Sequence, residues 1–330
     1  MLVTGPNGVG KTNLLEAAHV GAQGFSPRSR AEAQLVRFGE AAARVELAGH
    51  EAGTPVRTRV TVSRGEAKKV ELNGATLAAA DELRTRLSAL FFNPDRLAVV
   101  KGGPIVRRSY FDRMLGRLEP AQAALPGEYG RALAQRNASL RRLRAGLGPA
   151  SASEPWSDTL ASLGTELDNA RAALVGLLSP PFASFGELLG LDAVRLRYEA
   201  HGLTRAELDA RFASDLERGA TGAGPHLRDV GVLAGERDLR TYGSQGEQRA
   251  AVLALVLAEA AVTEERQGSP PLLLLDDVLS ELDAARRAAL VDALPPGGQT
   301  LITTTSRSAL PEAALPSLEI SVSPGEARAA

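Results

Sequence analysis

The hydrophobic pattern near the two ends of the chain predicts strands that alternate with helices. Residues 1–4 form a short apolar run that ends at a glycine. Towards the C-terminus, apolar spacing predicts helices over 248–264 and 282–293 and strands over 271–276 and 299–304. Because parallel strands need crossover helices between them, this alternation favours a mostly parallel sheet with helices packed on it.

A second pattern follows the first strand. The segments ARVELAG (43–49), VRTRVTV (56–62) and KKVELNG (68–74) have strand-like spacing and are separated by Gly, Pro and Ser. Short runs of this kind with turn residues between them predict an antiparallel β patch. We expect a helix over 75–90 after the patch.

The middle of the chain, from 105 to 190, has mostly helical spacing. Two leucine stripes lie on successive predicted helices, and a segment rich in Pro, Gly and Ser (146–156) separates them. We therefore predict a short antiparallel helical hairpin over about 131–178, only ~25–30 Å long. The stripes consist of Leu133, Leu140, Leu143 and Leu147, and of Leu160, Leu163, Leu167, Ala170, Leu174 and Leu177.

These patterns together predict an α/β fold with two domains. Residues 1–104 and 221–330 form a discontinuous head with a mixed sheet and the antiparallel β patch. Residues 105–220 form an inserted α-helical arm, which also contains a strand near 193–200 and a helix near 204–218.

Composition narrows the function classes. The 330 residues carry a formal net charge of −1, so the chain as a whole is not a basic nucleic-acid binder. With no cysteine, disulfides, thiolate metal sites and cysteine nucleophiles are excluded. No apolar run approaches the ~18 residues of a membrane span, and the first residues lack the basic and cleavage signals of a secretory peptide. We expect a cytoplasmic protein.

The loop after the first strand, GPNGVGKT (5–12), matches the phosphate-binding pattern G-x-x-x-x-G-K-[ST] in full. It follows a predicted strand and opens a predicted helix, which is the context that this motif requires. Lys11 brings positive charge to the outer phosphates, and the Thr12 hydroxyl can ligate Mg²⁺. The motif predicts nucleoside triphosphate binding by Gly5, Pro6, Asn7, Gly8, Val9, Gly10, Lys11, Thr12 and Asn13.

The segment LLLLDDVLSELD (272–283) supplies a partner for that loop. Its four leucines predict a buried central strand, and two carboxylates follow at the strand's end. Asp276 is the candidate Mg²⁺ ligand beside Thr12, and Asp277 is the candidate group that positions or deprotonates an attacking water.

A third motif, YGSQGEQR (242–249), opens the longest apolar helix near the C-terminus. A serine hydroxyl, a glycine backbone and a helix N-terminus together suit an anion, although a plain helix cap has the same composition. The candidate anion-binding residues are Ser244, Gln245, Gly246 and Glu247.

The order of these motifs resembles the ABC-type ATPases, and the details are similar to the RecF family of bacterial DNA-repair ATPases. The resemblance rests on collinear stretches that span almost the whole chain. They are NGVGKTNLLEA (7–17), FNPDRLAVVKGGPIVRRSYFD (92–112), LAQRNASLRRL (133–143), GPHLRD (224–229), YGSQGEQR (242–249) and LLLDDVLSELDAARR (273–287).

The resemblance implies an ATP-dependent homodimer that binds DNA and acts as a recombination mediator in repair and replication. Ser244 and Gly246 would then close in trans over the ATP held by Lys11 and its loop in a second subunit, with Mg²⁺ as cofactor. Slow, DNA-stimulated hydrolysis would time DNA release. The partners that the resemblance implies are RecR, RecO, single-strand-binding protein and the RecA recombinase that is loaded at gaps.

Two departures from the family pattern change this expectation. Family members normally begin some thirty residues earlier, so an N-terminal segment with adenine-side contacts is expected to be missing. Transporter ATPases carry a glutamate directly after the metal-binding aspartate and a histidine later in the chain. Here Asp277 stands at the position of the glutamate, and TLITTTSRS (300–308) has Thr and Ser in place of the histidine. These differences predict weak turnover.

Two other functions fit the phosphate-binding loop: a transporter-energising ATPase and a small-molecule kinase. The first conflicts with the roughly 230 residues between the loop and YGSQGEQR, and the second leaves Ser244 to Glu247 without a role.

The sequence also suggests roles for individual charged residues. We expect Arg136 to pair with a carboxylate such as Glu166, and His226 to have a structural role. Candidate DNA contacts are Arg107, Arg108, Arg131, Arg141 and Arg142.

Overall fold

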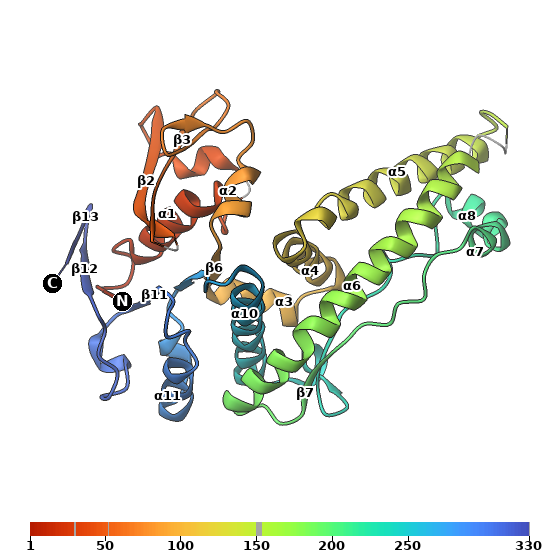
Figure 1. Cartoon of the computed structure of the whole chain (residues 1–330). Helices are drawn as coiled ribbons and strands as arrows, with labels where there is room; N and C mark the ends of the chain where they lie inside the picture. The colour runs from red at the N-terminus through yellow and green to blue at the C-terminus, as the bar shows by residue number, and fades with distance from the viewer. Residues whose placement is uncertain (30, 52, 150–153, 330) are drawn as a thin grey trace. The chain divides into compact units, whose positions relative to one another are not determined.

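The chain folds into two compact units. The structure is a computed structural model that describes residues 1–29, 31–51, 53–149 and 154–329 (Figure 1). Unit 1 consists of Met1–Leu97, Ser184–Asp192 and Ser244–Ala330, and unit 2 of Ala98–Ala183 and Ala193–Gly243. These boundaries differ from the 104/105 and 220/221 divisions expected from sequence, because the chain between 221 and 243 adds two strands, 231–234 and 237–238, and a short helix to unit 2.

A six-stranded sheet forms the centre of unit 1, in the order β13-β12-β1-β11-β10-β6. All neighbouring pairs are parallel except β12 with β13, as the alternation of helices and strands predicts. The strands are β1 (Leu2–Thr4), β6 (Ala89–Phe92), β10 (Leu272–Leu275), β11 (Thr300–Thr304), β12 (Glu319–Ser323) and β13 (Glu326–Ala329).

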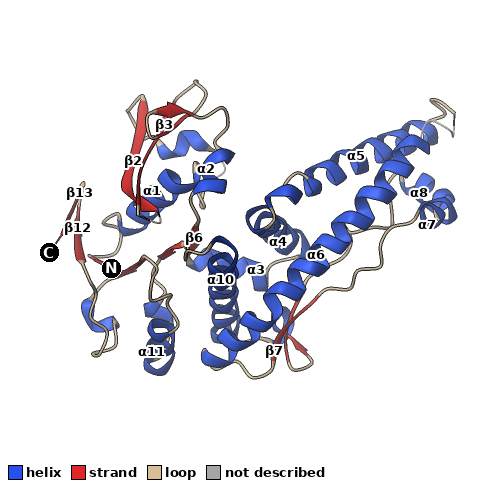
Figure 2. Ribbon diagram, in the orientation of Figure 1, coloured by secondary structure: helices blue, strands red, loops and turns tan. Residues whose placement is uncertain are grey.

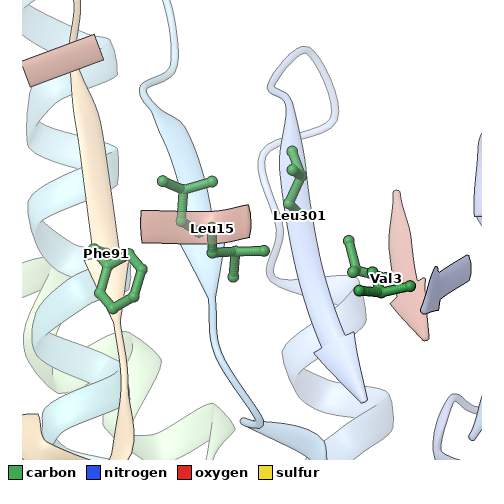
Figure 3. Close-up of a cluster of buried hydrophobic side chains, with 6 residues drawn as sticks. Val3, Leu15, Phe91 and Leu301 are labelled. Atoms are coloured by element: carbon green, nitrogen blue, oxygen red, sulfur yellow. The ribbon is translucent and has the colours of Figure 1, made fainter. Parts of the chain in front are cut away.

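The apolar side chains of these strands pack against helix α1 (Lys11–Gln23). Figure 3 shows Leu15 of α1 lying against Phe91, Leu301 and Val3, each from a different strand. Leu15 and Phe91 are fully buried, and each such side chain stabilises the fold by about 1.5–3 kcal/mol relative to an exposed one. This packing fixes the start of α1 against the carboxyl end of the parallel strands. The other helices of unit 1 are α10 (Gln245–Gln267), α11 (Ala284–Asp292) and α2 (Asp81–Arg86).

The antiparallel patch is a four-stranded sheet, in the order β2-β3-β4-β5, that contacts α1 (Figure 2). Its strands are β2 (Ala42–Glu51), β3 (Thr54–Ser63), β4 (Lys69–Leu72) and β5 (Ala75–Thr76).

The helix expected over 75–90 is wrong for most of its length. Asn73 and Gly74 both have positive φ, 49° and 85°, and such Asn-Gly pairs favour a tight hairpin turn. The chain therefore returns as β5, and only residues 81–86 are helical before β6 begins. Short 3₁₀ turns cover Glu32–Leu35, Pro94–Leu97, Pro120–Gln122, Leu279–Glu281 and Arg307–Ala309.

Unit 2 is mostly helical, with one three-stranded sheet in the order β7-β8-β9. Its strands are β7 (Val194–Arg197), β8 (Gly231–Ala234) and β9 (Arg237–Asp238). Its helices are α3 (Ala98–Lys101), α4 (Pro104–Leu118), α5 (Leu125–Arg144), α6 (Glu154–Leu188), α7 (Arg205–Ala210), α8 (Phe212–Arg218) and α9 (Leu239–Tyr242); the last residues of α6 belong to unit 1.

Helices α5 and α6 lie side by side and run in opposite directions (Figure 1). Tyr129 of α5 packs against Gly164 of α6, while Arg136 donates from its Nε to Ser157 Oγ at 3.1 Å. The buried members of the second leucine stripe, Leu160, Leu167, Ala170 and Leu174, face the interior of this unit. Residues 150–153 of the connecting segment lie outside the described residues.

The Arg136 side chain is buried, as its place in the leucine seam requires, but its partner is not Glu166. Its Nη1 donates to Asp215 Oδ2 at 2.8 Å and to Thr221 Oγ1 at 2.7 Å, and Asp215 is also fully buried. Removing one member of such a buried pair costs roughly 3–5 kcal/mol, because the other charge is left uncompensated. The pair holds α5 against α8.

Candidate functional site

The phosphate-binding loop connects β1 to α1 with a backbone that requires glycine at defined places. A Cβ on Gly5 would lie 2.7 Å from the Val322 carbonyl oxygen of β12, a distance that side chains essentially never adopt. Gly10 caps α1 with φ 113°, which favours glycine over every other residue. The loop therefore keeps the wrapped shape in which backbone N–H groups can point at phosphate oxygens.

Lys11 is the first residue of α1, and its amine turns back into the loop. Its Nζ donates to the carbonyl oxygens of Gly5 and Pro6 at 2.7 and 2.9 Å. The side chain is buried, at 8% exposure. The charge of the Lys11 amine therefore lies where the motif predicts the outer phosphates to bind. The loop residues around it, Pro6, Asn7 and Gly8, are exposed to solvent.

The two motifs that were predicted to share a Mg²⁺ ion meet directly. Thr12 Oγ1 donates to the Asp276 carboxylate, 2.9 Å from Oδ2 and 3.1 Å from Oδ1. Asp276 follows β10, and its backbone N–H donates to the Phe92 carbonyl of the adjacent strand at 2.9 Å. Mg²⁺ prefers a few protein oxygens together with phosphates and waters, so this hydroxyl and carboxylate fit its chemistry.

Asp277 adopts a left-handed backbone conformation with φ 50°. Asp and Asn tolerate this region better than other residues with side chains, so its residue type matches its geometry. Together with Arg249 and a set of apolar side chains, it lines a cavity of about 370 Å³. The remaining lining residues are Phe92, Pro94, Leu97, Val252, Leu253, Val278 and Leu282.

Thr303 of β11 joins the two aspartates, and sequence reasoning did not assign it a role. Its Oγ1 donates to Asp276 Oδ1 at 2.8 Å and accepts from the Asp277 backbone N–H, also at 2.8 Å. The residue is fully buried. The sign of it in the sequence was the run of threonines in TLITTTSRS. These residues form β11, which pairs with β10, and this pairing brings Thr303 beside the two aspartates that follow β10.

We expect Thr303→Val to lower the free energy of unfolding by about 1–3 kcal/mol, because it keeps the volume but leaves the Asp277 N–H buried without its acceptor. ATP hydrolysis should fall as well, since Asp276 loses a donor that orients it. Thr303→Ser retains the hydroxyl and is the matched control. Denaturant unfolding and a phosphate-release assay measure both effects; equal behaviour of the Val and Ser variants would remove Thr303 from the site.

An open cavity of about 1010 Å³ lies beside α1 and the antiparallel sheet. Arg28 enters its wall and donates from Nη1 to Glu16 Oε2 at 2.9 Å and to Asn13 Oδ1 at 3.3 Å. Asn13 was predicted as a nucleotide contact, and Arg28 was not. Arg28 lies outside the recognised motifs, a few residues after the end of α1, and the turn of the chain there brings its charge back onto that helix.

The motif YGSQGEQR begins at Tyr242, the last residue of α9, and its residues from Ser244 onward cap and open α10. Ser244 is the N-cap: its Oγ accepts the Glu247 N–H at 3.2 Å, and its own N–H donates to Glu247 Oε2 at 2.7 Å. This reciprocal capping box is the structural role that the composition allows. Ser244 and Gln245 are exposed, so the same turn presents a hydroxyl and a helix N-terminus to solvent.

The predicted DNA contact of Arg107 is wrong. This side chain is 2% exposed and forms a bidentate pair with Asp229, with N···O distances of 2.9 and 2.7 Å. Its Nη1 also donates to the carbonyls of Val99 and Val100. Arg107 therefore joins α3, α4 and the segment before β8. The sequence could not distinguish it from its neighbour because burial is set by tertiary packing.

The other candidate DNA contacts differ in exposure. Arg108 is half-buried and donates to the Arg228 carbonyl at 2.9 Å, and burial lowers the pKa of its guanidinium. The side chains of Arg131, Arg141 and Arg142 on α5 are exposed.

His226 has the structural role that its sequence suggested. Its Nδ1 accepts from the Tyr129 hydroxyl at 2.6 Å, and its Nε2 donates to the Thr221 carbonyl at 3.2 Å. Burial lowers the pKa of this imidazole below its ordinary value, which favours the neutral form that the two hydrogen bonds require.

Among the described residues, no helix combines the length and apolar character needed to cross a bilayer.

Sequence comparisons relate the chain to one family. The RecF/RecN/SMC N-terminal domain matches residues 1–323. A protein of Heliobacterium modesticaldum named "DNA replication and repair protein RecF" is 36% identical over 318 residues, which cover 92% of this chain and 86% of the relative. A protein of the same name from Anaeromyxobacter dehalogenans (strain 2CP-C) is 39% identical over 338 residues, covering 96% of this chain and 88% of the relative.

Solved structures give the same relation. The recombination mediator protein RecF bound to ATP, from the RecFOR pathway, matches with a TM-score of 0.86 and 27% identity, covering all of this chain and 91% of that one. An Smc head bound to the C-terminal winged-helix domain of ScpA matches with a TM-score of 0.55 at 17% identity, covering all of this chain and 88% of that one, and shares the fold.

Proposed function

Because the chain belongs to the RecF family of DNA replication and repair proteins, we propose that it is an ATP-gated DNA-binding recombination mediator. The observation that carries this proposal is the contact between Thr12 Oγ1 and the Asp276 carboxylate, 264 residues apart in sequence. It brings the phosphate-binding loop and the aspartates into one nucleotide site. The ligand is ATP, as in the related RecF structure.

Binding of the phosphates and activation of the attacking water are assigned to different residues of this site. Lys11 and the loop backbone hold the β- and γ-phosphates, and Thr12 and Asp276 are the residues that would hold a Mg²⁺ ion, which would supply positive charge to neutralise the phosphates. Asp277 orients or deprotonates the attacking water. A short carboxylate, and Thr and Ser where a histidine would stand, support slow hydrolysis that DNA stimulates and that acts as a timer.

The exposed first turn of α10 acts on the ATP of a second copy. Ser244 supplies a hydroxyl and Gly246 a backbone N–H at a helix N-terminus, where an anion is stabilised. A triphosphate reaches this turn from the partner's loop, whereas a diphosphate lacks the group that would bridge the two copies. ATP therefore holds a symmetric dimer together, and hydrolysis releases it.

The dimer binds DNA with exposed arginines of unit 2. Arg131, Arg141 and Arg142 follow one exposed side of α5, and phosphate contacts of this kind position a protein without reading sequence. DNA-bound dimers then cooperate with RecR, RecO and single-strand-binding protein at a gap, where RecA is loaded. The name of the related structure, a recombination mediator of the RecFOR pathway, supports this assignment.

We expect Asp277→Asn to trap the ATP-bound dimer on DNA. Asparagine tolerates the same left-handed backbone, so the change removes the charge while keeping the turn. Losing a general base lowers turnover by roughly 10²–10⁴-fold. Single-turnover hydrolysis and the lifetime of the complex on a gapped duplex measure the effect, with the exposed Asp292→Asn of α11 as control. Wild-type turnover in the Asp277 variant would remove this residue from the mechanism.

A further inference from the structure

Three segments of unit 1 meet at the side chain of Arg286. This residue lies in the first turn of α11, where its backbone N–H donates to the capping carboxylate of Asp283 at 2.9 Å. Its guanidinium Nε donates to the Leu189 carbonyl, beyond the end of α6, at 2.9 Å. The Asp283 carboxylate lies 3.5 Å from its Nη1. The guanidinium is therefore held in one orientation by groups on two segments.

The third segment is the first turn of α10. A Cβ built on Gly246 would stand 3.7 Å from Arg286 Nη1 and 4.0 Å from Ser244 Oγ. The hydroxyl and the guanidinium thus flank the same small space, which the missing side chain of Gly246 leaves open. About a third of the Arg286 side chain is exposed, so this space is reached from solvent.

The charge at this place is suited to an anion. A guanidinium carries five N–H donors. Among the described residues, the Leu189 carbonyl accepts from Nε, and the Asp283 carboxylate lies at a longer 3.5 Å from Nη1. The remaining donors can bind a planar or tetrahedral oxyanion, which arginine recognises better than lysine does. The Asp283 carboxylate, itself largely exposed, compensates the charge only partly.

The neighbouring arginine is placed differently. Arg287 donates from Nε to the Leu282 carbonyl at 2.8 Å and from Nη1 to the Ala309 carbonyl at 3.5 Å. Both acceptors are backbone groups within the same part of unit 1, which gives Arg287 a structural role. The two adjacent arginines therefore form a matched pair for experiment.

We propose that Arg286 is a further phosphate-binding residue of the half-site formed by Ser244 and Gly246, and that it binds the terminal phosphate of a nucleoside triphosphate held by a second copy of this chain. The proposal rests on the ATP-dependent dimer proposed above. It adds a full positive charge to a turn that otherwise offers a hydroxyl and the partial charge of a helix N-terminus.

The test compares Arg286→Gln, Arg286→Lys and Arg287→Gln by sedimentation with ATP and by binding of a fluorescent ATP analogue to the monomer. Arg286→Gln should weaken ATP-dependent dimerisation on the order of tenfold or more while leaving monomer ATP binding unchanged, because a charge-assisted hydrogen bond is lost. Arg286→Lys should retain most of the dimer, and Arg287→Gln all of it. Equal loss in the Gln and Lys variants with a lowered Tm would overturn the proposal and leave Arg286 as a structural link.

A mixing experiment tests the action in trans. When Arg286→Gln and Lys11→Met chains are combined in equal amounts with ATP, neither chain forms a stable dimer with itself, whereas a mixed dimer holds one composite site in which both groups are intact. Hydrolysis should then exceed the sum of the two variants measured separately and reach at most about half of the wild-type rate, because only one of the two sites of a two-fold symmetric interface is restored. No recovery would place Arg286 in cis and overturn the proposal. A wild-type chain that stays monomeric with ATP would instead contradict the dimer itself.

Discussion

The Lys11→Met variant is expected to lose ATP-dependent dimerisation completely. The Lys11 amine is buried inside the loop, 2.7 and 2.9 Å from two carbonyl oxygens, and its charge is available where the outer phosphates bind. Methionine keeps an unbranched side chain only one atom shorter but removes the charge and all three donors. Each lost charge-assisted hydrogen bond costs roughly 1.5–3 kcal/mol, so ATP affinity should fall by about two orders of magnitude.

Sedimentation with saturating ATP and a fluorescent-nucleotide titration measure the two effects of this substitution. Lys69→Met is a suitable control, because Lys69 is an exposed lysine on β4 of the same unit. An unchanged dimer fraction in Lys11→Met would contradict the assignment of the loop as the nucleotide site, because ATP binding to the loop depends directly on the charge of Lys11.

The Ser244→Arg variant should bind ATP normally as a monomer and fail to dimerise. The new side chain would project from the exposed first turn of α10 into the space that the partner's triphosphate is proposed to enter. The substitution also removes a helix cap, at a cost of about 0.5–2 kcal/mol, which is small compared with the loss of the interface.

Thr204→Arg separates these two effects. Thr204 caps α7 in unit 2 in the same way, with its side chain accepting the Glu207 N–H at 3.1 Å, so the control loses a cap without touching α10. Normal dimerisation is expected there. If Ser244→Arg lost monomer ATP binding instead, the turn would act on the nucleotide of its own chain, and the sandwich would have to be abandoned.

The sequence allowed the chemistry of the site to be predicted where a motif and its context agree. Lys11, Thr12 and Asp276 are placed by a loop and a strand whose spacing follows from the α/β alternation, and the structure brings all three together. The parallel core of the sheet was predictable for the same reason, because β1 and β10 are each followed by a helix, α1 and α11, that can cross over the sheet.

What could not be predicted depends on contacts between distant segments. No role was assigned from the sequence to Thr303, Arg28 or Arg286, because the role of each depends on contacts with a segment distant in sequence or on a turn that the pattern does not show. The misassignment of Arg107 as a DNA contact has the same origin. Two adjacent arginines at the start of a helix look alike in the sequence, and only the folded chain shows that Arg107 is buried and paired with Asp229. Local turn chemistry at Asn73 and Gly74 was visible and would have corrected the helix expected over 75–90.

The measurement that most directly tests an ATP-gated dimer is the solution mass of the wild-type chain by sedimentation, with ADP or ATP, in the presence and absence of a gapped duplex. A dimer that forms only with ATP and is favoured by DNA is the predicted result, because only a triphosphate joins the loop of one copy to the α10 turn of the other. A monomer under every condition would contradict the proposal, since Ser244 and Gly246 would then have no phosphate to bind.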